Sequence, residues 1–280
     1  MKPNRVLALL LLLVATGLRA APAPGDEPLP LWDAGLLAGG LYSPDYPAAA
    51  SNHWNGLALP YAYYRGQRLR ADQAGLRGRF SLGERLEFSL GLGGAFPVRS
   101  RDNAEREGMP DLGYLLEAGP TIGYRLYADG ASSLRLLAQA RAVFAVSGDD
   151  HGYQGIALQP ELSYRRNGFL RPDLQLLAGA WARFGQDGLN RRYYEVRPAD
   201  VRPDRPAYQA RDGYQQSALS LGLRHRFSPD LSLFLGGQLF LTAAAANTES
   251  PLFRRNSNFT VGVALQYRLF HSKQTLADQD

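Results

Sequence analysis

Residues 133–146 read Ser-Leu-Arg-Leu-Leu-Ala-Gln-Ala-Arg-Ala-Val-Phe-Ala-Val, and this stretch decides the fold. Every second position is apolar from one end to the other, while Arg135, Gln139 and Arg141 lie among the positions between. Successive side chains of a β-strand point to opposite faces of a sheet, so a period of two predicts a strand with one apolar face. A helix does not produce this spacing.

The same alternation recurs along the chain, and thirty Gly, fifteen Tyr and twelve Phe are typical of a protein built from many short strands. We predict about twelve strands. They cover residues 32–41, 55–64, 68–80, 86–96, 115–126, 133–146, 154–164, 173–184, 190–197, 212–227, 231–242 and 258–270. One apolar face per strand also describes a soluble β-sandwich, so the alternation leaves two fold classes open.

The polar face of the strands favours a membrane barrel over a sandwich. A water-filled lumen admits Arg, Gln and Ser on strand after strand, and aromatic residues gather at the two membrane interfaces. Ten aromatic residues lie near the ends of the expected strands: Trp32, Tyr42, Trp54, Tyr63, Tyr64, Tyr124, Tyr164, Phe184, Phe227 and Tyr267. We therefore expect an all-β protein, a transmembrane antiparallel β-barrel that contacts outer-membrane lipid.

The N-terminus predicts export. Lys2 and Arg5 precede an apolar run at 6–15, which is too short to cross a bilayer, and Ala20 and Ala21 are candidate cleavage points. This pattern indicates a cleaved signal peptide at 1–20 and export by the Sec pathway. We expect a periplasmic lead at 21–31, an outer-membrane barrel at 32–270 and a polar tail at 271–280, in the cell outer membrane of a Gram-negative bacterium.

Charge and cysteine content exclude several classes. Without Lys2, Arg5 and Arg19, the 31 basic residues fall to 28 against 26 acidic ones, and Arg recurs along the chain beside Asp and Glu. That distribution argues against a nucleic-acid partner, which needs a basic patch on one face. Without any cysteine, the chain has no disulfide and no residue for lipoprotein acylation.

The connections between strands give the first candidate site. Twelve strands put both ends of the barrel in the periplasm, and long connections at 42–54, 198–211 and 243–257 then fall outside the cell. By the same parity 97–114 is periplasmic, although it is long and charged; a miscounted strand is the alternative. We expect this segment to dock a partner, unless it is a plug or a surface loop. The candidate partner-binding residues are Arg99, Arg101, Asp102, Arg106, Met109, Asp111 and Leu112.

The polar faces of the strands give the second candidate site. Arg135, Arg141, Arg183, Arg224 and Arg226 face the lumen if the apolar residues face lipid. One interpretation is an anion-biased pore or a plugged lumen balanced by Glu87, Glu117 and Glu161. The other is a closed barrel whose interior charges pair with one another, and the limited space inside twelve strands favours it.

Enzymatic and metal-binding motifs are weak. A barrel hydrolase needs a His base within reach of a Ser nucleophile, and none of the four His has an evident catalytic partner. Asp149-Asp150-His151 is the nearest approach to a metal site and is more simply a solvated turn. We expect no enzyme activity, no metal and no cofactor.

Several short motifs resemble the MipA/OmpV family, in order along nearly all of the chain after its first twenty residues. They are Pro44-Asp45-Tyr46, Leu59-Pro60-Tyr61 with Tyr64-Arg65-Gly66, Gly108-Met109-Pro110-Asp111-Leu112, then Glu117, Gly119 and Pro120, Arg205-Pro206-Ala207-Tyr208, Gly213-Tyr214 and Ser250-Pro251-Leu252. The chain departs from the family at its end. There Leu269-Phe270 and ten mostly polar residues stand in place of the terminal aromatic that the barrel assembly machinery usually reads.

The resemblance implies an outer-membrane location and a scaffold role. The chain is similar to a family member that brings a murein lytic transglycosylase together with a bifunctional penicillin-binding protein. Other family members resemble small-solute porins or surface adhesins, and these functions are the alternatives.

Overall fold

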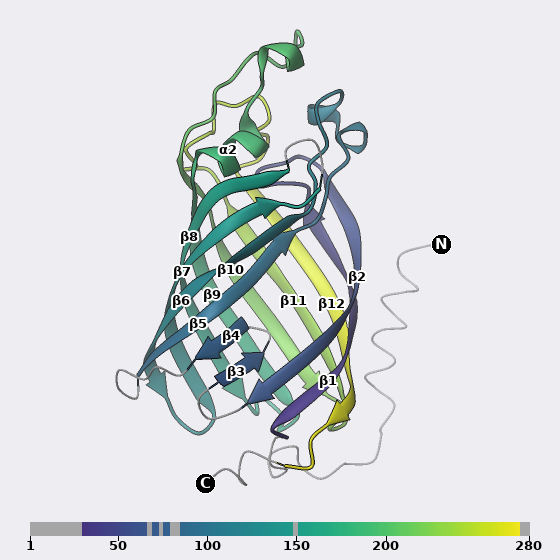
Figure 1. The fold of residues 1–280 in the computed structure, drawn as a ribbon, viewed down its shortest axis with the longest axis vertical. Helices are drawn as coiled ribbons and strands as arrows, with labels where there is room; N and C mark the ends of the chain where they lie inside the picture. Colours follow the sequence, from purple (N-terminus) through teal and green to yellow (C-terminus); the bar gives the residue numbers. More distant parts are fainter. Residues whose placement is uncertain (1–29, 66–68, 73–74, 79–84, 148–150, 275–280) are drawn as a thin grey trace.

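The computed structural model describes residues 30–65, 69–72, 75–78, 85–147 and 151–274, which form an antiparallel β-barrel with strands oblique to its long axis (Figure 1). The strands are β1 (Trp32–Pro44), β2 (Asn52–Arg65), β3 (Leu69–Asp72), β4 (Gly75–Gly78), β5 (Leu86–Ala95), β6 (Leu115–Ala128), β7 (Ser132–Ala145), β8 (Gly152–Asn167), β9 (Leu174–Gly185), β10 (Gly213–Arg226), β11 (Leu231–Leu241) and β12 (Ser257–His271). Each pairs with its neighbours in sequence, and β1 pairs with β12, which closes the barrel. The expected signal peptide and the end of the tail lie outside the described residues.

Two of the expected strands are wrong. Residues 190–197 were expected to be a strand, but Asp187–Tyr194 form the helix α2. Leu189 and Tyr193 are four residues apart and both buried, which is helical spacing, and Arg191 forms an ion pair with Asp187 one turn away. The expected strand at 68–80 is instead the two four-residue strands β3 and β4, which pair with each other. The error at 190–197 added one strand to the expected number. The error at 68–80 left one out, because two strands were counted as one.

The error at 68–80 reverses the expected position of 97–114. Because β3 and β4 form a hairpin, the connection after β5 leaves the barrel at the same end as the connections β1–β2, β9–β10 and β11–β12. The parity that placed 97–114 beside the two ends of the chain is therefore wrong. The miscounted strand, which the sequence left open, is the explanation.

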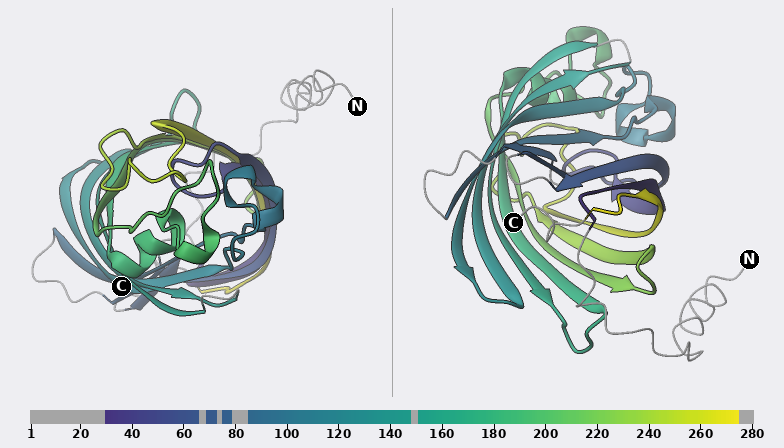
Figure 2. Two further views of the ribbon diagram at one scale, coloured as in Figure 1. Left: turned by 90° about the horizontal axis from the view of Figure 1, so that it is seen from above. Right: turned by 60° about the horizontal axis from the view of Figure 1, so that its bottom comes forward.

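Four connections pack together into a cap, defined here as residues 45–51, 96–114, 186–212 and 242–256. Figure 2, on its left, looks onto this end and shows α2 and its neighbours lying across part of the barrel mouth. The cap also contains the short 3-10 helices η1 (Ser100–Asp102), η2 (Ala104–Arg106) and η3 (Pro198–Asp200). Most residues of the buried apolar cluster belong to it, Leu189, Tyr194 and Leu252 among them.

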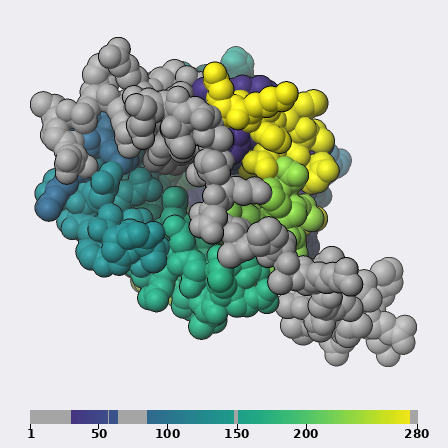
Figure 3. All heavy atoms as spheres, turned by 90° about the horizontal axis from the view of Figure 1, so that it is seen from below, coloured from purple at the N-terminus to yellow at the C-terminus, as the bar shows by residue number. Residues whose placement is uncertain are grey.

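The opposite end, called the turn end here, carries both ends of the described chain. Leu31 N–H donates to the Gln274 carbonyl at 2.8 Å, and the ends of β1 and β12 lie side by side (Figure 3). The connections at 129–131, 168–173 and 227–230 are short. Long connections therefore gather at one end of the barrel and short ones at the other.

The outer surface of the barrel is apolar and has aromatic residues near both ends. Leu36, Leu92, Leu136, Leu158, Leu221, Leu235 and Leu265 are exposed there. Near the cap, Tyr42 lies 5.5 Å from Trp54 and 5.9 Å from Phe259 between ring centroids. Trp32, Tyr124, Phe227 and Tyr267 are exposed near the turn end. Tyr63 differs from the expected girdle, because it pairs with buried Asp33 on the lumen side.

Among the described residues, no helix is long and apolar enough to cross a membrane.

The cap should come apart without the barrel. Leu252 is fully buried in the cap, so Leu252→Ala should cost the cap about 2–5 kcal/mol and make it sensitive to protease. Gel mobility before and after heating should still report a folded barrel. Leu170→Ala is the control, since Leu170 is exposed at the turn end. Equal protease resistance of Leu252→Ala and the native chain would refute an independently packed cap.

Candidate functional sites in the cap and the lumen

Tyrosines hold three of the four cap connections together. Tyr46 stacks on Tyr193 at 6.3 Å and donates its hydroxyl proton to the Leu252 carbonyl at 2.9 Å. Tyr194 donates to the Pro47 carbonyl at 3.1 Å, and Ser250 Oγ donates to the Tyr194 carbonyl at 2.6 Å. Three of the four connections are thereby joined through side chains that reach the backbone of another connection.

Buried arginines join the remaining connection to the others. Arg106 donates to the Pro110 carbonyl at 3.1 Å and the Arg192 carbonyl at 3.4 Å, with its guanidinium 5.9 Å from the Tyr46 ring centre. Arg205 donates to the carbonyls of Glu105 and Glu107 at 2.8 and 3.1 Å. A guanidinium has five N–H donors, so one arginine can satisfy several buried carbonyls at once. Segment 97–114 is therefore an integral part of the cap.

The candidate partner-binding residues divide into two groups. Arg106, Met109 and Leu112 are buried in the cap, where they pack or hydrogen-bond internally. Arg99, Arg101, Asp102 and Asp111 are exposed, and the Asp111 carboxylate accepts the Ser100 N–H at 2.7 Å. Only the exposed group is available to a partner, and its binding role stays a prediction.

Burial shifts the acidity of the cap tyrosines. Removal from water raises the pKa of Tyr46, with a smaller opposing effect from the Arg106 cation. Burial likewise raises the pKa of Tyr194. Both phenols are therefore neutral hydrogen-bond donors when the cap is folded.

His53 has a partner that the sequence did not reveal. Its Nδ1 lies 2.5 Å from Asp45, and Asn103 donates to the second Asp45 oxygen at 2.7 Å. Asp45 and Asn103 come from two different connections and His53 from the start of β2, so no spacing along the chain indicates the whole contact. Asp149 and Asp150, from the stretch that came nearest to a metal-site pattern in the sequence, lie outside the described residues. Elsewhere the described chain shows no group of three or more His, Asp or Glu placed to hold a metal ion.

The candidate lumen arginines belong to a network of interior charges. Arg183 on β9 forms an ion pair of 2.7 Å with Glu117 on β6, and Arg141 on β7 lies 3.6 Å from the same carboxylate. Two strands separate β6 from β9 in the wall, so the Arg183–Glu117 pair spans the inside of the barrel. Arg183 also donates to Gln215, and Gln215 donates to Asn190 of α2. The network thus joins the lumen to the cap.

A second group of charges lies nearer the turn end. Glu87 accepts from Arg125 at 3.1 Å and from Arg135 at 3.3 Å. Arg224 donates to Ser232 Oγ at 3.2 Å, and Arg226 lies opposite Ser232 in the β10–β11 register, on the same side of the sheet. Pairing among the interior charges dominates on the β5–β9 side, which fits a closed lumen better than an anion-selective one.

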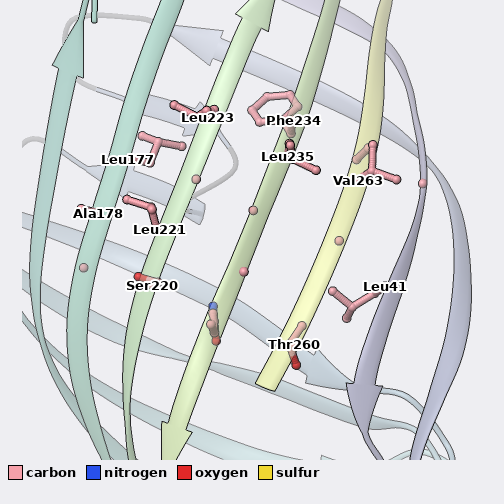
Figure 4. A pocket seen from close by; sticks show the side chains of 18 of the residues that line it. Leu41, Leu177, Ala178, Ser220, Leu221, Leu223, Phe234, Leu235, Thr260 and Val263 are labelled. Atoms are coloured by element: carbon pink, nitrogen blue, oxygen red, sulfur yellow. The ribbon is translucent and has the colours of Figure 1, made fainter. Parts of the chain in front are cut away.

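The β9–β12 and β1 side of the lumen contains a hollow with a largely apolar lining. A cavity of about 520 Å³ lies here, and Figure 4 shows Leu41, Leu177 and Phe234 around it. Of the residues that line this hollow, the sequence pointed to Glu161 as a balancing charge of the lumen and to none of the apolar ones as part of a site. The glycines of the alternating strands were the available signal.

Glu117 should be the stability centre of the lumen. Its side chain is 7% exposed, so Glu117→Gln leaves Arg183 and Arg141 without their charge partner and should cost about 3–5 kcal/mol. Urea unfolding in lipid vesicles measures this. Glu249→Gln removes the exposed pair with Arg211 and should cost less than about 1 kcal/mol. Equal midpoints for the two variants would contradict a structural role of the interior network.

The cap should loosen in alkali. A phenol whose pKa is raised by folding contributes stability that is complete below the ordinary tyrosine pKa of about 10 and falls as pH rises above it. Protease sensitivity of the cap should therefore increase above about pH 10. The double variant Tyr46→Phe, Tyr194→Phe should be less stable at neutral pH and show a weaker pH dependence. An unchanged pH dependence would show that other groups open the cap.

Comparisons with known proteins identify the family. Among solved structures, the chain is similar to the COG4313 outer membrane channel from Pseudomonas putida F1, with 14% identity over 89% of this chain and 100% of the other, and a TM-score of 0.48. The NanC porin is 11% identical over 84% of this chain and 100% of its own, with a TM-score of 0.40. The protease OmpT from Escherichia coli is 11% identical over 85% and 95%, with a TM-score of 0.31. Likenesses at this level do not indicate a function.

No curated protein matches the chain. The family model described as "MltA-interacting protein MipA" matches residues 36–269, which run from within β1 to within β12 and include all four connections of the cap. The chain therefore belongs to the MipA family.

Proposed function

We propose that the barrel spans the outer membrane of a Gram-negative cell, with the cap outside and the turn end in the periplasm. The exposed leucines of the outer surface suit lipid contact, and exposed aromatics near both ends suit the two interfaces. Outer-membrane barrels have long extracellular loops and short periplasmic turns, which supports this direction. The expected export by the Sec pathway agrees with this placement.

Within that membrane we propose a scaffold that holds a murein lytic transglycosylase and a bifunctional penicillin-binding protein near the outer membrane. The observation that carries the proposal is the family match, because the family model is named for interaction with MltA. Catalysis is not part of the proposed role, since a scaffold needs surfaces only.

The docking surface then has to be at the turn end, where murein enzymes can reach it. Leu170, in the turn between β8 and β9, is 84% exposed and has a φ of 62°. A left-handed conformation is uncommon for a leucine and carries a steric cost. An apolar side chain held outward in this way fits an anchor for a partner protein. The exposed cap residues Arg99, Arg101 and Asp102 are the competing surface.

Two variants distinguish the surfaces. Leu170→Gly removes the side chain but suits the positive φ, so the turn keeps its shape. The matched cap variant changes Arg99, Arg101 and Asp102 to Ser. We expect pull-downs from solubilised envelopes to recover several-fold less transglycosylase with Leu170→Gly and an unchanged amount with the cap variant.

Other outcomes decide against parts of the proposal. Loss with the cap variant alone would place docking on 97–114 and reverse the proposed direction of the barrel. Failure of the native chain to recover any murein enzyme would refute the scaffold. In that case a small-solute channel is the second candidate, favoured by the hollow in the lumen.

A further inference from the structure

We propose that the hollow in the lumen binds an amphiphile with an apolar body and one anionic group. This site is separate from the proposed scaffold role, because it lies inside the barrel and not on its ends. The argument rests on the shape of the β9–β12 and β1 wall and on the arginines beside it.

A row of glycines leaves this wall without side chains at one level. Gly222, Gly236 and Gly262 are aligned on β10, β11 and β12, with Gly222 opposite Gly236 and Gly236 opposite Gly262. All three share the inward side with Arg224, which is two residues from Gly222 on the same face. Three adjacent strands thus lack inward side chains at one level.

Close packing of strands does not explain all of these glycines. A Cβ at Gly39 would lie 2.3 Å from the Val263 carbonyl oxygen, so Gly39 is required for the approach of two backbones. A Cβ at Gly222 would meet no atom nearer than 3.6 Å. Glycine in a strand weakens it, and a ligand or backbone that approaches closely is the usual reason for its presence. At Gly222 the space is left for a ligand.

The hollow has the size and lining of a ligand site. Its volume of about 520 Å³ lies within the usual range for small-molecule pockets, about 300–1,000 Å³. Leu37, Leu41, Leu177 and Phe234 supply apolar contacts. An alkyl chain or a small ring system fits such a lining, since the hydrophobic effect favours the burial of both.

Positive charge lies at one end of the hollow. Arg165 lines it, and the Arg224 guanidinium lies 5.1 Å from the ring centre of Phe234, which also lines it. The strongest charged neighbours of Arg224 include Arg226 and Arg165, and its buried Nε has no hydrogen-bond partner. An anionic group here would relieve repulsion among the arginines and accept hydrogen bonds from them.

The carboxylate that lines the hollow is engaged by two glutamines. Glu161 carries this carboxylate, which accepts from Gln139 at 2.8 Å and Gln159 at 3.4 Å. Along β8, Glu161 lies closer to the cap than Arg165 does. The anionic group of a bound amphiphile would therefore point toward the turn end.

Binding of dodecanoate to the purified chain in phosphatidylcholine vesicles tests the site, with dodecanol as the uncharged probe. Gly222→Leu fills the hollow and should weaken binding of both probes by at least about tenfold. Arg224→Gln should weaken dodecanoate about tenfold and leave dodecanol unchanged. Gly56→Leu is the matched control. Its position pairs with Gly40 on the outer face, and a Cβ there meets nothing within 4 Å.

The remaining outcomes overturn the proposal. Native-like binding by Gly222→Leu, or equal affinity of the native chain for dodecanoate and dodecanol, would show partition into lipid only. Gly222→Ala provides a second test if the leucine variant does not show the heat-dependent gel shift of a folded barrel. Its methyl group fits the measured space and should give a smaller loss. Recovery of murein enzymes is measured separately, so failure here leaves the scaffold proposal standing.

Discussion

The ladder between β1 and β12 is the interaction on which the rest of the structure depends. It runs from Asp33 opposite His271 to Tyr42 opposite Val261 and joins the two ends of the sheet. In lipid an open sheet edge leaves backbone groups without hydrogen bonds, so closure is a condition for membrane insertion. Closure also divides alternate side chains between lipid and lumen. Arg183 and Glu117 can meet across the interior only because the sheet curves back on itself.

The period-two pattern predicted most of the strands and the inward direction of their arginines, because both follow from alternation within one strand. It failed where tertiary contacts decide. Residues 190–194 belong to a helix because Leu189 and Tyr193 bury one face against the cap. The Arg183–Glu117 and His53–Asp45 contacts depend on strand order and register, which a single sequence does not contain. The expected place of 97–114 was wrong for the same reason.

The cap and the barrel are stabilised by different kinds of contact. The barrel has few buried apolar side chains, since many of its leucines face outward and its lumen holds paired charges. The cap has the buried cluster and is held by side chains that reach the backbone of other connections. Most of the motifs that resemble the family, such as Met109-Pro110-Asp111-Leu112 and Ser250-Pro251-Leu252, lie in the cap. In this chain they are therefore best explained by packing.

The two walls of the lumen differ in a way that constrains transport. On the β5–β9 side, Glu87 and Glu117 each engage two arginines, and the pairs of the buried Glu117 are costly to separate. A ligand in the lumen would lie against the glycine row of β10–β12, where three neighbouring strands lack inward side chains at one level. Asn190 of α2 is joined to Arg183 through Gln215, so the position of the cap and the arrangement of the charged wall are coupled. Any opening of the cap would have to break this chain of hydrogen bonds, whereas occupation of the glycine wall would not.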